Sequence, residues 1–103
     1  RARHEPQERR RYCFGAWCDI RGDVNAVAGA YVTGVPDWMA NEMAVYPPND
    51  TTHVGKDEFT EVFCDSEYER QEQLKIEIAQ NYDYDLARER NDSFAYVASA
   101  VGL

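Results

Sequence analysis

Residues 73–80 read QLKIEIAQ, and they carry the clearest secondary-structure signal in the chain. Apolar residues occupy every second position, at Leu74, Ile76 and Ile78, with polar residues between them. Successive side chains of a β-strand point to opposite faces, so an alternation of period two is typical of a half-buried strand. The segment therefore predicts a strand that buries these three aliphatic side chains on one face.

Three other stretches also favour strands. Residues 11–18 are aromatic and end before a turn, residues 25–34 combine small residues with valine and tyrosine, and residues 58–64 place two phenylalanines on one face. Aromatic and β-branched residues are enriched in strands, and a glycine inside residues 25–34 weakens a helix there. Together with residues 73–80, these stretches predict strands separated by turns that contain glycine or proline.

Two stretches fit either a strand or a helix. In residues 37–44, which follow Pro36, Asp37 could cap a single helical turn. In residues 93–101, apolar side chains recur at both helical and strand spacing, and Asp92 could cap a helix. Both alternatives stay open at the level of the sequence.

The chain has 103 residues, which is enough for one domain and too few for two. Several short strands with few helices predict a mostly β fold, a small antiparallel six-stranded β-sandwich with room for one short helix. We expect this single β domain to span residues 11–103. Residues 1–10 are rich in arginine and nearly free of apolar side chains, which predicts a flexible arm.

The chain carries 19 acidic and 11 basic residues, which gives a formal net charge of −8 at pH 7. The charge is uneven, because residues 1–11 hold five arginines against two glutamates while the remainder is strongly acidic. An acidic protein lacks the cations that neutralise phosphates, so we expect no general nucleic-acid binding. No apolar run approaches the ~20 residues that span a bilayer, so we expect no membrane-spanning segment.

Two short motifs are weak indications of a site. The tripeptide Arg21-Gly22-Asp23 matches an integrin-recognition sequence, but a turn explains its glycine. Residues 50–61 match a calcium loop of the EF-hand kind at the first, sixth and twelfth positions and fail at the others. Neither motif therefore predicts a ligand.

Catalytic and metal-binding groups are also weakly represented. Asp83 and Asp85 have the spacing of a metal-binding carboxylate pair, yet on a strand they would simply face solvent. The two histidines, His4 and His53, lie in the predicted arm and in a loop, so no paired base and nucleophile is evident. Cys13, Cys18, His53 and Cys64 could in principle supply a zinc set, but the step from Cys13 to Cys18 is wide for a zinc site, and a disulfide is favoured over it. We expect no metal, no cofactor and no enzymatic activity.

Two cysteine-containing strands lie far apart in the chain, at Arg11-Tyr12-Cys13-Phe14 and at Glu61-Val62-Phe63-Cys64. With the other predicted strands, this arrangement resembles the MAX effectors, the avirulence and ToxB-like proteins that plant-pathogenic fungi secrete. The resemblance implies a six-stranded, two-sheet β-sandwich with a disulfide between Cys13 and Cys64. Cys18 departs from the family pattern, because it could pair in place of Cys13.

The same resemblance implies a binding function. Members of the family act as binding proteins, and several bind heavy-metal-associated domains of host proteins by pairing an exposed edge strand with the partner's sheet. We therefore expect a secreted monomer that reaches the host cell interior and binds a host protein, either a heavy-metal-associated domain or an immune receptor. The implied contact residues lie on the predicted second strand, at Val27, Tyr31, Val32 and Thr33. The apolar members of that set would equally suit the core.

A second hypothesis is an intracellular acidic inhibitor or immunity protein that blocks a basic enzyme or a nucleic-acid-binding site. It depends on residues 57–92, which hold twelve aspartates and glutamates. A small subunit of a larger assembly is a third class and would account for the arginine-rich arm. Two glycosylation sequons, at Asn49 and Asn91, favour secretion.

Overall fold

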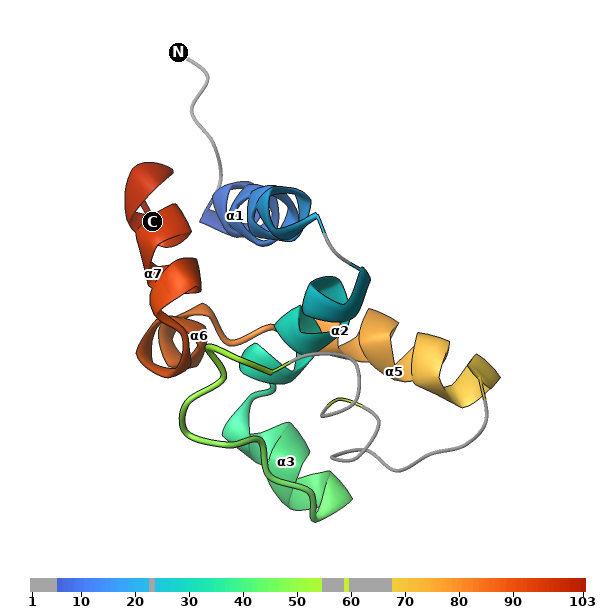
Figure 1. Ribbon diagram of the computed structural model, residues 1–103. Helices are drawn as coiled ribbons and strands as arrows, with labels where there is room; N and C mark the ends of the chain where they lie inside the picture. The colour runs from blue at the N-terminus through green and yellow to red at the C-terminus, as the bar shows by residue number, and fades with distance from the viewer. Residues whose placement is uncertain (1–5, 23, 55–58, 60–67) are drawn as a thin grey trace.

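The computed structural model describes residues 6–22, 24–54, 59 and 68–103. Within these residues the chain forms six α-helices and no β-strand (Figure 1). The helices are α1 (Pro6–Arg21), α2 (Val24–Thr33), α3 (Asp37–Met43), α5 (Tyr68–Gln80), α6 (Tyr84–Arg90) and α7 (Asp92–Ala100). The predicted mostly β fold, a six-stranded β-sandwich over residues 11–103, is therefore wrong.

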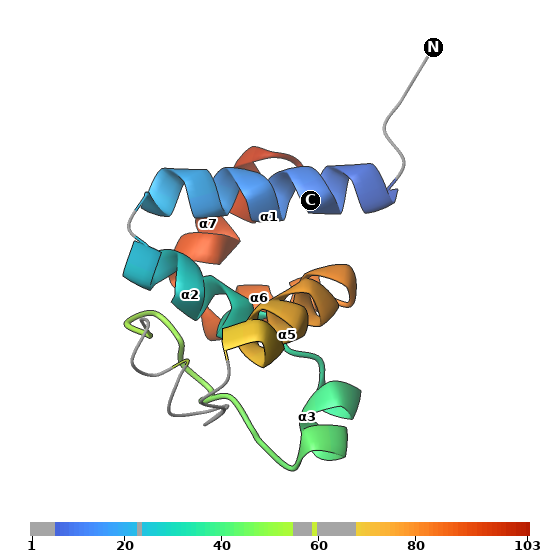
Figure 2. The ribbon, with the colours of Figure 1, turned by 90° about the vertical axis from the view of Figure 1, so that its right-hand side faces the viewer.

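Helix α2 lies at the centre of the molecule and contacts α1, α5 and α6. Helix α7 follows α6 directly and packs against α1, and α1 and α7 together form one end of the molecule (Figure 1). Helix α3 lies at the opposite end, far from α1 in both views, with α5 between the two levels (Figure 2).

Helix α5 replaces the strand predicted for residues 73–80. In a helix, residues four apart share a face, and Ile78 is accordingly fully buried while Leu74 is half-buried. Ile76 lies on another face and is 49% exposed. The alternating pattern misled because most of its residues, including Gln, Glu, Lys and Leu, are good helix formers.

Two substitutions in α5 distinguish the observed helix from the predicted strand. We expect Ile78→Ala to lower the free energy of unfolding by about 2–5 kcal/mol, because it leaves a cavity in the core. Ile76→Ala should cost less than about 1 kcal/mol, because half of that side chain already faces water. Urea denaturation of the two variants measures the difference. Equal losses of unfolding free energy would contradict the burial of Ile78 and the exposure of Ile76 on a helix.

Helix α1 replaces the strand predicted for residues 11–18. Cys13 and Trp17 lie about one turn apart and are fully buried, whereas Tyr12 faces solvent. Apolar side chains at this spacing form the buried stripe of an amphipathic helix.

The predicted arm, residues 1–10, overlaps the same helix. Residues 6–10 form the start of α1, and residues 1–5 lie outside the described part of the chain. Arg9 Nη1 donates a hydrogen bond to the carbonyl oxygen of Gly102 at 3.4 Å. The described half of this region is therefore helical and touches the C-terminal end of the chain.

Helix α2 replaces the strand predicted for residues 25–34. Residues 28–36 are all buried except Tyr31, which is half-buried. A helix that is apolar on nearly every side belongs to the core, and its small residues let neighbouring helices approach closely. Burial therefore outweighs the low helix propensity of Gly29. Of the strand predicted at residues 58–64, only Phe59 is described.

The two ambiguous stretches are both helices. Helix α3 follows Pro36 and ends at Ala44, which adopts the left-handed conformation, with φ 56°, that commonly terminates helices. Helix α7 follows Asn91, whose side-chain oxygen accepts a hydrogen bond from the backbone N–H of Phe94 at 3.0 Å. Asn91, and not Asp92, is therefore the cap.

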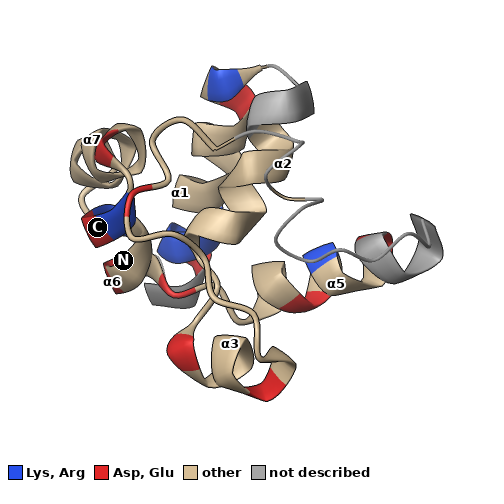
Figure 3. Cartoon of the chain, turned by 60° about the horizontal axis from the view of Figure 1, so that its bottom comes forward, with Lys and Arg blue, Asp and Glu red and all other residues tan. Residues whose placement is uncertain are grey.

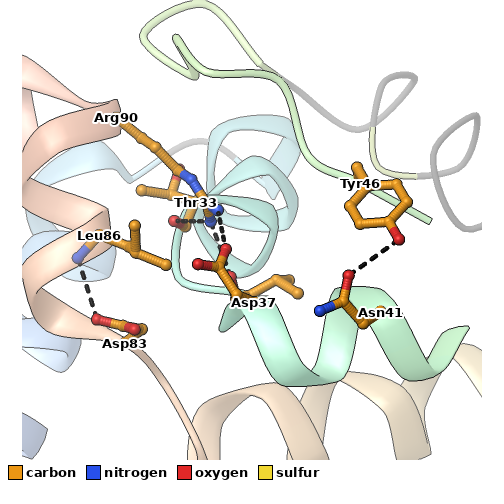
Figure 4. A network of polar contacts seen from close by, with 8 residues as sticks. Thr33, Asp37, Asn41, Tyr46, Asp83, Leu86 and Arg90 are labelled. Carbon is orange, nitrogen blue, oxygen red and sulfur yellow. Dashed lines mark hydrogen bonds and ion pairs between the residues drawn. The ribbon is translucent and has the colours of Figure 1, made fainter. Parts of the chain in front are cut away.

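Arg90 links α6 to the connection between α2 and α3 through hydrogen bonds and an ion pair (Figure 4). Its Nη1 donates to the carbonyl oxygens of Thr33 at 3.1 Å and Val35 at 2.8 Å. Its Nη2 lies 3.7 Å from Oδ1 of Asp37, the first residue of α3, which carries this ion pair in place of the predicted cap. A largely buried cation thus satisfies carbonyls at the end of α2 and fixes the start of α3.

Aromatic rings connect the core to the surface between α1 and α5. Trp17 and Phe94 meet edge to face with their centroids 4.9 Å apart. Tyr82 lies 5.9 Å from Phe94 and 4.3 Å from Phe14, centroid to centroid. Such pairs add about 0.5–1.5 kcal/mol each to the stability that burial provides.

Candidate binding groove between α1 and α5

A groove with a volume of about 860 Å³ opens between α1 and α5, which face each other in Figure 2. Its lining combines an excess of positive charge with four aromatic side chains. The groove is lined by Arg10, Arg11, Phe14, Gly15, Tyr31, Glu72, Lys75, Ile76, Ala79, Gln80, Asn81, Tyr82 and Tyr84.

The charged lining residues are three cations and one carboxylate. The guanidinium carbon of Arg10 lies 5.6 Å from the ring centroid of Tyr84. The ammonium of Lys75 lies 6.0 Å from the ring centroid of Tyr31 and forms an ion pair with Glu72 at 3.5 Å. Cation–π contacts of this kind hold the cations over the rings. The groove therefore has an excess of two positive charges in a chain whose net charge is −8.

The aromatic side chains of the groove have fixed positions. The hydroxyl of Tyr82 donates a buried hydrogen bond to the carbonyl oxygen of Ala30 at 2.7 Å. Phe14 contacts both Tyr82 and Tyr31, the latter with ring centroids 5.5 Å apart. Behind Tyr82 lies Gly34, where an added Cβ would come within 2.0 Å of the ring. A bound ligand would meet Phe14 and Tyr31, which are half-buried, because Tyr82 and Tyr84 are only 6% and 8% exposed and support these rings from within.

The tyrosine hydroxyls of the groove stay protonated at neutral pH. Burial raises the pKa of Tyr84 to about 12, although Arg10 and Arg11 oppose the rise. Burial likewise raises the pKa of Tyr31, and it raises that of Tyr82 well above its ordinary value. The aromatic surface is therefore uncharged, and the cations set the charge of the groove. The arrangement suits a ligand that combines an apolar body with negative charge.

Of the contact residues predicted on an edge strand, only Tyr31 lines the groove. All four lie on α2, so the edge strand is wrong. Val32 and Thr33 are fully buried, and Val27 is half-buried. The hydroxyl of Thr33 is also occupied, because it donates to Oγ1 of Thr51 at 2.7 Å.

The predicted disulfide between Cys13 and Cys64 conflicts with the structure, in which Cys13 and Cys18 are free thiols. Cys64 lies outside the described residues. Burial raises the pKa of both thiols, Cys13 and Cys18, to about 11. They are protonated at neutral pH and therefore poor nucleophiles.

The aspartates singled out in the sequence have structural partners. Asp83 caps α6 by accepting a hydrogen bond from the backbone N–H of Leu86 at 3.0 Å. Asp85 forms an ion pair with Arg88. Asp50, the first position of the calcium-loop match, accepts from the backbone N–H of Thr52. The described residues contain no group of three or more potential metal ligands.

Two other motifs also have local explanations. Arg21 ends α1 with its guanidinium carbon 5.1 Å from the ring centroid of Trp17, and Gly22 has a φ of 63°. Asp23, the third residue of that tripeptide, lies outside the described residues. Asn91, the acceptor residue of the second sequon, is fully buried, and its amide nitrogen donates to the carbonyl oxygen of Thr51 at 3.0 Å.

The cations of the groove were not expected from the sequence to belong to a site. Arg10 was assigned to the arm, and Lys75 to the polar face of a strand. A helical reading of residues 6–21 would have paired Arg10 with Phe14, because residues four apart share a face. No sequence signal would have paired that face with α5, which lies about sixty residues away along the chain.

In the described part of the chain, no helix is both long enough and apolar enough to cross a membrane. No protein-family model, curated protein or solved structure matches the chain.

Proposed function

We propose that this chain is a binding protein whose groove takes an acidic, apolar segment of another protein. The observation that carries the proposal is the local reversal of charge. Three cations and one carboxylate lie around uncharged aromatic rings, in a chain that is otherwise strongly acidic. Electrostatic complementarity of this kind favours one class of partner and speeds the encounter with it.

The dimensions of the groove favour a helical segment. Residues 72–80 of α5 advance about 12 Å along the helix axis, which is about two turns. A helix laid beside them could place apolar side chains on the aromatic rings and carboxylates near Arg10, Arg11 and Lys75. Recognition of an amphipathic helix in a groove is a common mode of peptide binding.

The proposal keeps a binding role and replaces the mode of contact expected from the sequence. The MAX resemblance depended on strands, which the described residues lack. A host protein, as the partner of a secreted effector, stays a prediction. In that setting the groove, and not strand pairing, would make the contact.

A charge-matched pair of variants tests the groove. The probe is a synthetic amphipathic helix of about four turns with leucine and phenylalanine on one face and glutamate on the other. We expect the protein to bind this peptide, measured by fluorescence anisotropy, and to bind a lysine version of it far more weakly. Arg10→Glu should weaken binding by about tenfold or more, and added salt should weaken it further.

Arg9→Glu is the control, because it makes the same charge change at a neighbouring residue that does not line the groove. It should leave most of the affinity intact. Equal losses in the two variants, or equal binding of the two peptides, would contradict the proposal.

A further inference from the structure

Helix α3 and the residues after it carry an exposed patch of opposite character to the groove. Trp38 is 54% exposed and Tyr46 is 63% exposed. Asp37 and Glu42 are also exposed, and Figure 3 shows acidic residues on α3 and no basic one. We call Asp37, Trp38, Glu42 and Tyr46 the α3 patch.

One hydrogen bond and one ion pair fix the conformation of the α3 patch. The hydroxyl of Tyr46 donates to Oδ1 of Asn41 at 2.9 Å, which folds this tyrosine back onto the helix (Figure 4). Arg90 lies 3.7 Å from Asp37, at the start of α3. Asn41 and Glu42 lie three and four residues after Trp38, so they share its face of the helix. The patch therefore presents a tryptophan beside carboxylates on one preformed surface.

The α3 patch and the groove complement each other. The groove offers aromatic rings and the cations Arg10, Arg11 and Lys75. The α3 patch offers a half-exposed indole, which can stack on those rings or on a guanidinium. Glu42 supplies most of the negative charge, because Asp37 already lies beside Arg90.

We propose that the groove of one molecule takes the α3 patch of a second copy of this chain. This proposal rests on the proposed function, because it names an occupant for the same groove. A molecule cannot fill its own groove in this way, since α3 lies at the end of the molecule opposite α1 (Figure 2). Contacts between two different surfaces are heterologous, and they extend into open chains or close into rings.

The net charge of −8 on each copy opposes this contact. At physiological salt the Debye length is about 8 Å, so distant charges are largely screened while close pairs across the contact are not. A single short helix buries little area, which places the contact among weak, transient interfaces. We expect a dissociation constant on the order of 0.1 mM, with the monomer expected from the sequence prevailing in dilute solution.

Analytical ultracentrifugation of the full chain over a range of concentrations tests the proposal. The wild-type protein should form species larger than a dimer as its concentration rises. Trp38→Ala and Arg10→Glu should each weaken association by about thirtyfold or more, as expected for the loss of a central contact. Tyr96→Ala is the control, because it removes an aromatic side chain that is 76% exposed on α7, outside both surfaces.

Mixing the two variants gives the sharpest result. Trp38→Ala keeps an intact groove and Arg10→Glu keeps an intact α3 patch. An equimolar mixture should therefore form a dimer of the two variants and nothing larger, although each variant alone stays monomeric. A wild-type protein that stays monomeric, a mixture that does not associate, or association that survives in either variant would overturn the proposal.

The glutamate peptide separates this proposal from the proposed function. If Trp38→Ala binds the peptide while the wild-type protein does not self-associate, the groove is upheld and α3 is excluded as its occupant. If neither protein binds the peptide and neither self-associates, both proposals fail.

Discussion

Gly34→Ala is expected to destabilise the fold by about 3 kcal/mol, the upper part of the range for overpacking a core. An added Cβ would come within 2.0 Å of one ring carbon of Tyr82 and within 2.2 Å of two others. The ring has little freedom to move, because its hydroxyl bonds the carbonyl oxygen of Ala30 and its face contacts Phe14. The midpoint of urea denaturation should fall accordingly, with an unchanged slope.

Gly15→Ala is the matched control, because an added Cβ there meets nothing within 4 Å. Gly15 lies inside α1, where alanine is favoured over glycine by about 1 kcal/mol, so this variant should be more stable than the wild-type protein. A smaller side chain at Tyr82, combined with Gly34→Ala, should recover part of the lost stability. A neutral or stabilising effect of Gly34→Ala alone would contradict the close packing of the backbone just after α2 against this ring.

A short hydrophobic pattern does not distinguish a strand from a helix in this chain. In residues 73–80, Leu74 and Ile78 lie on one face in either a strand or a helix. Only Ile76 separates the two structures, and its exposure depends on which neighbours cover α5. The strand prediction therefore depended on Ile76 alone, whereas the helix-forming composition of the whole segment favoured a helix.

Local signals performed better where one residue sets the backbone. The break at Pro36 and the start of a helix near residue 92 were both predicted within one residue, as alternatives to strands. Proline and capping side chains act through their nearest neighbours, so they can be read without tertiary contacts. Helix α2 is the opposite case, because its burial on nearly every side follows from the packing of α1, α5 and α6 around it.

The candidate site, like the fold class, was not predicted from the sequence. Tyr31 was named as a contact residue, on a strand that the structure replaces with a helix. The cations were not named, since an arginine in an arginine-rich terminus carries no mark of a site. The groove exists only because α1 and α5 both pack on α2, and a pattern within either helix cannot predict that arrangement.

Phe94→Ala is expected to cost about 3–5 kcal/mol, the usual range for removing a large aromatic side chain from a core. Phe94 is fully buried, and its ring contacts that of Trp17 at a centroid distance of 4.9 Å. It also supports the groove from behind, because Tyr82 and Tyr84 lie 5.9 and 6.1 Å from it. A domain of this size has a total stability of about 5–15 kcal/mol, so the loss is a large share of it.

Thermal unfolding measures this loss, with Tyr96→Ala as its matched control in the same helix. Tyr96 is 76% exposed, and its removal should change the stability by no more than about 0.5 kcal/mol. Phe94→Ala should lower Tm by more than about 12 °C, given a shift of about 4 °C or more for each kcal/mol. Similar shifts in both variants would mean that α7 does not bury the Phe94 face. A large shift confined to Phe94→Ala would place the ring at the junction of α1, α6 and α7, where the core and the groove share their aromatic side chains.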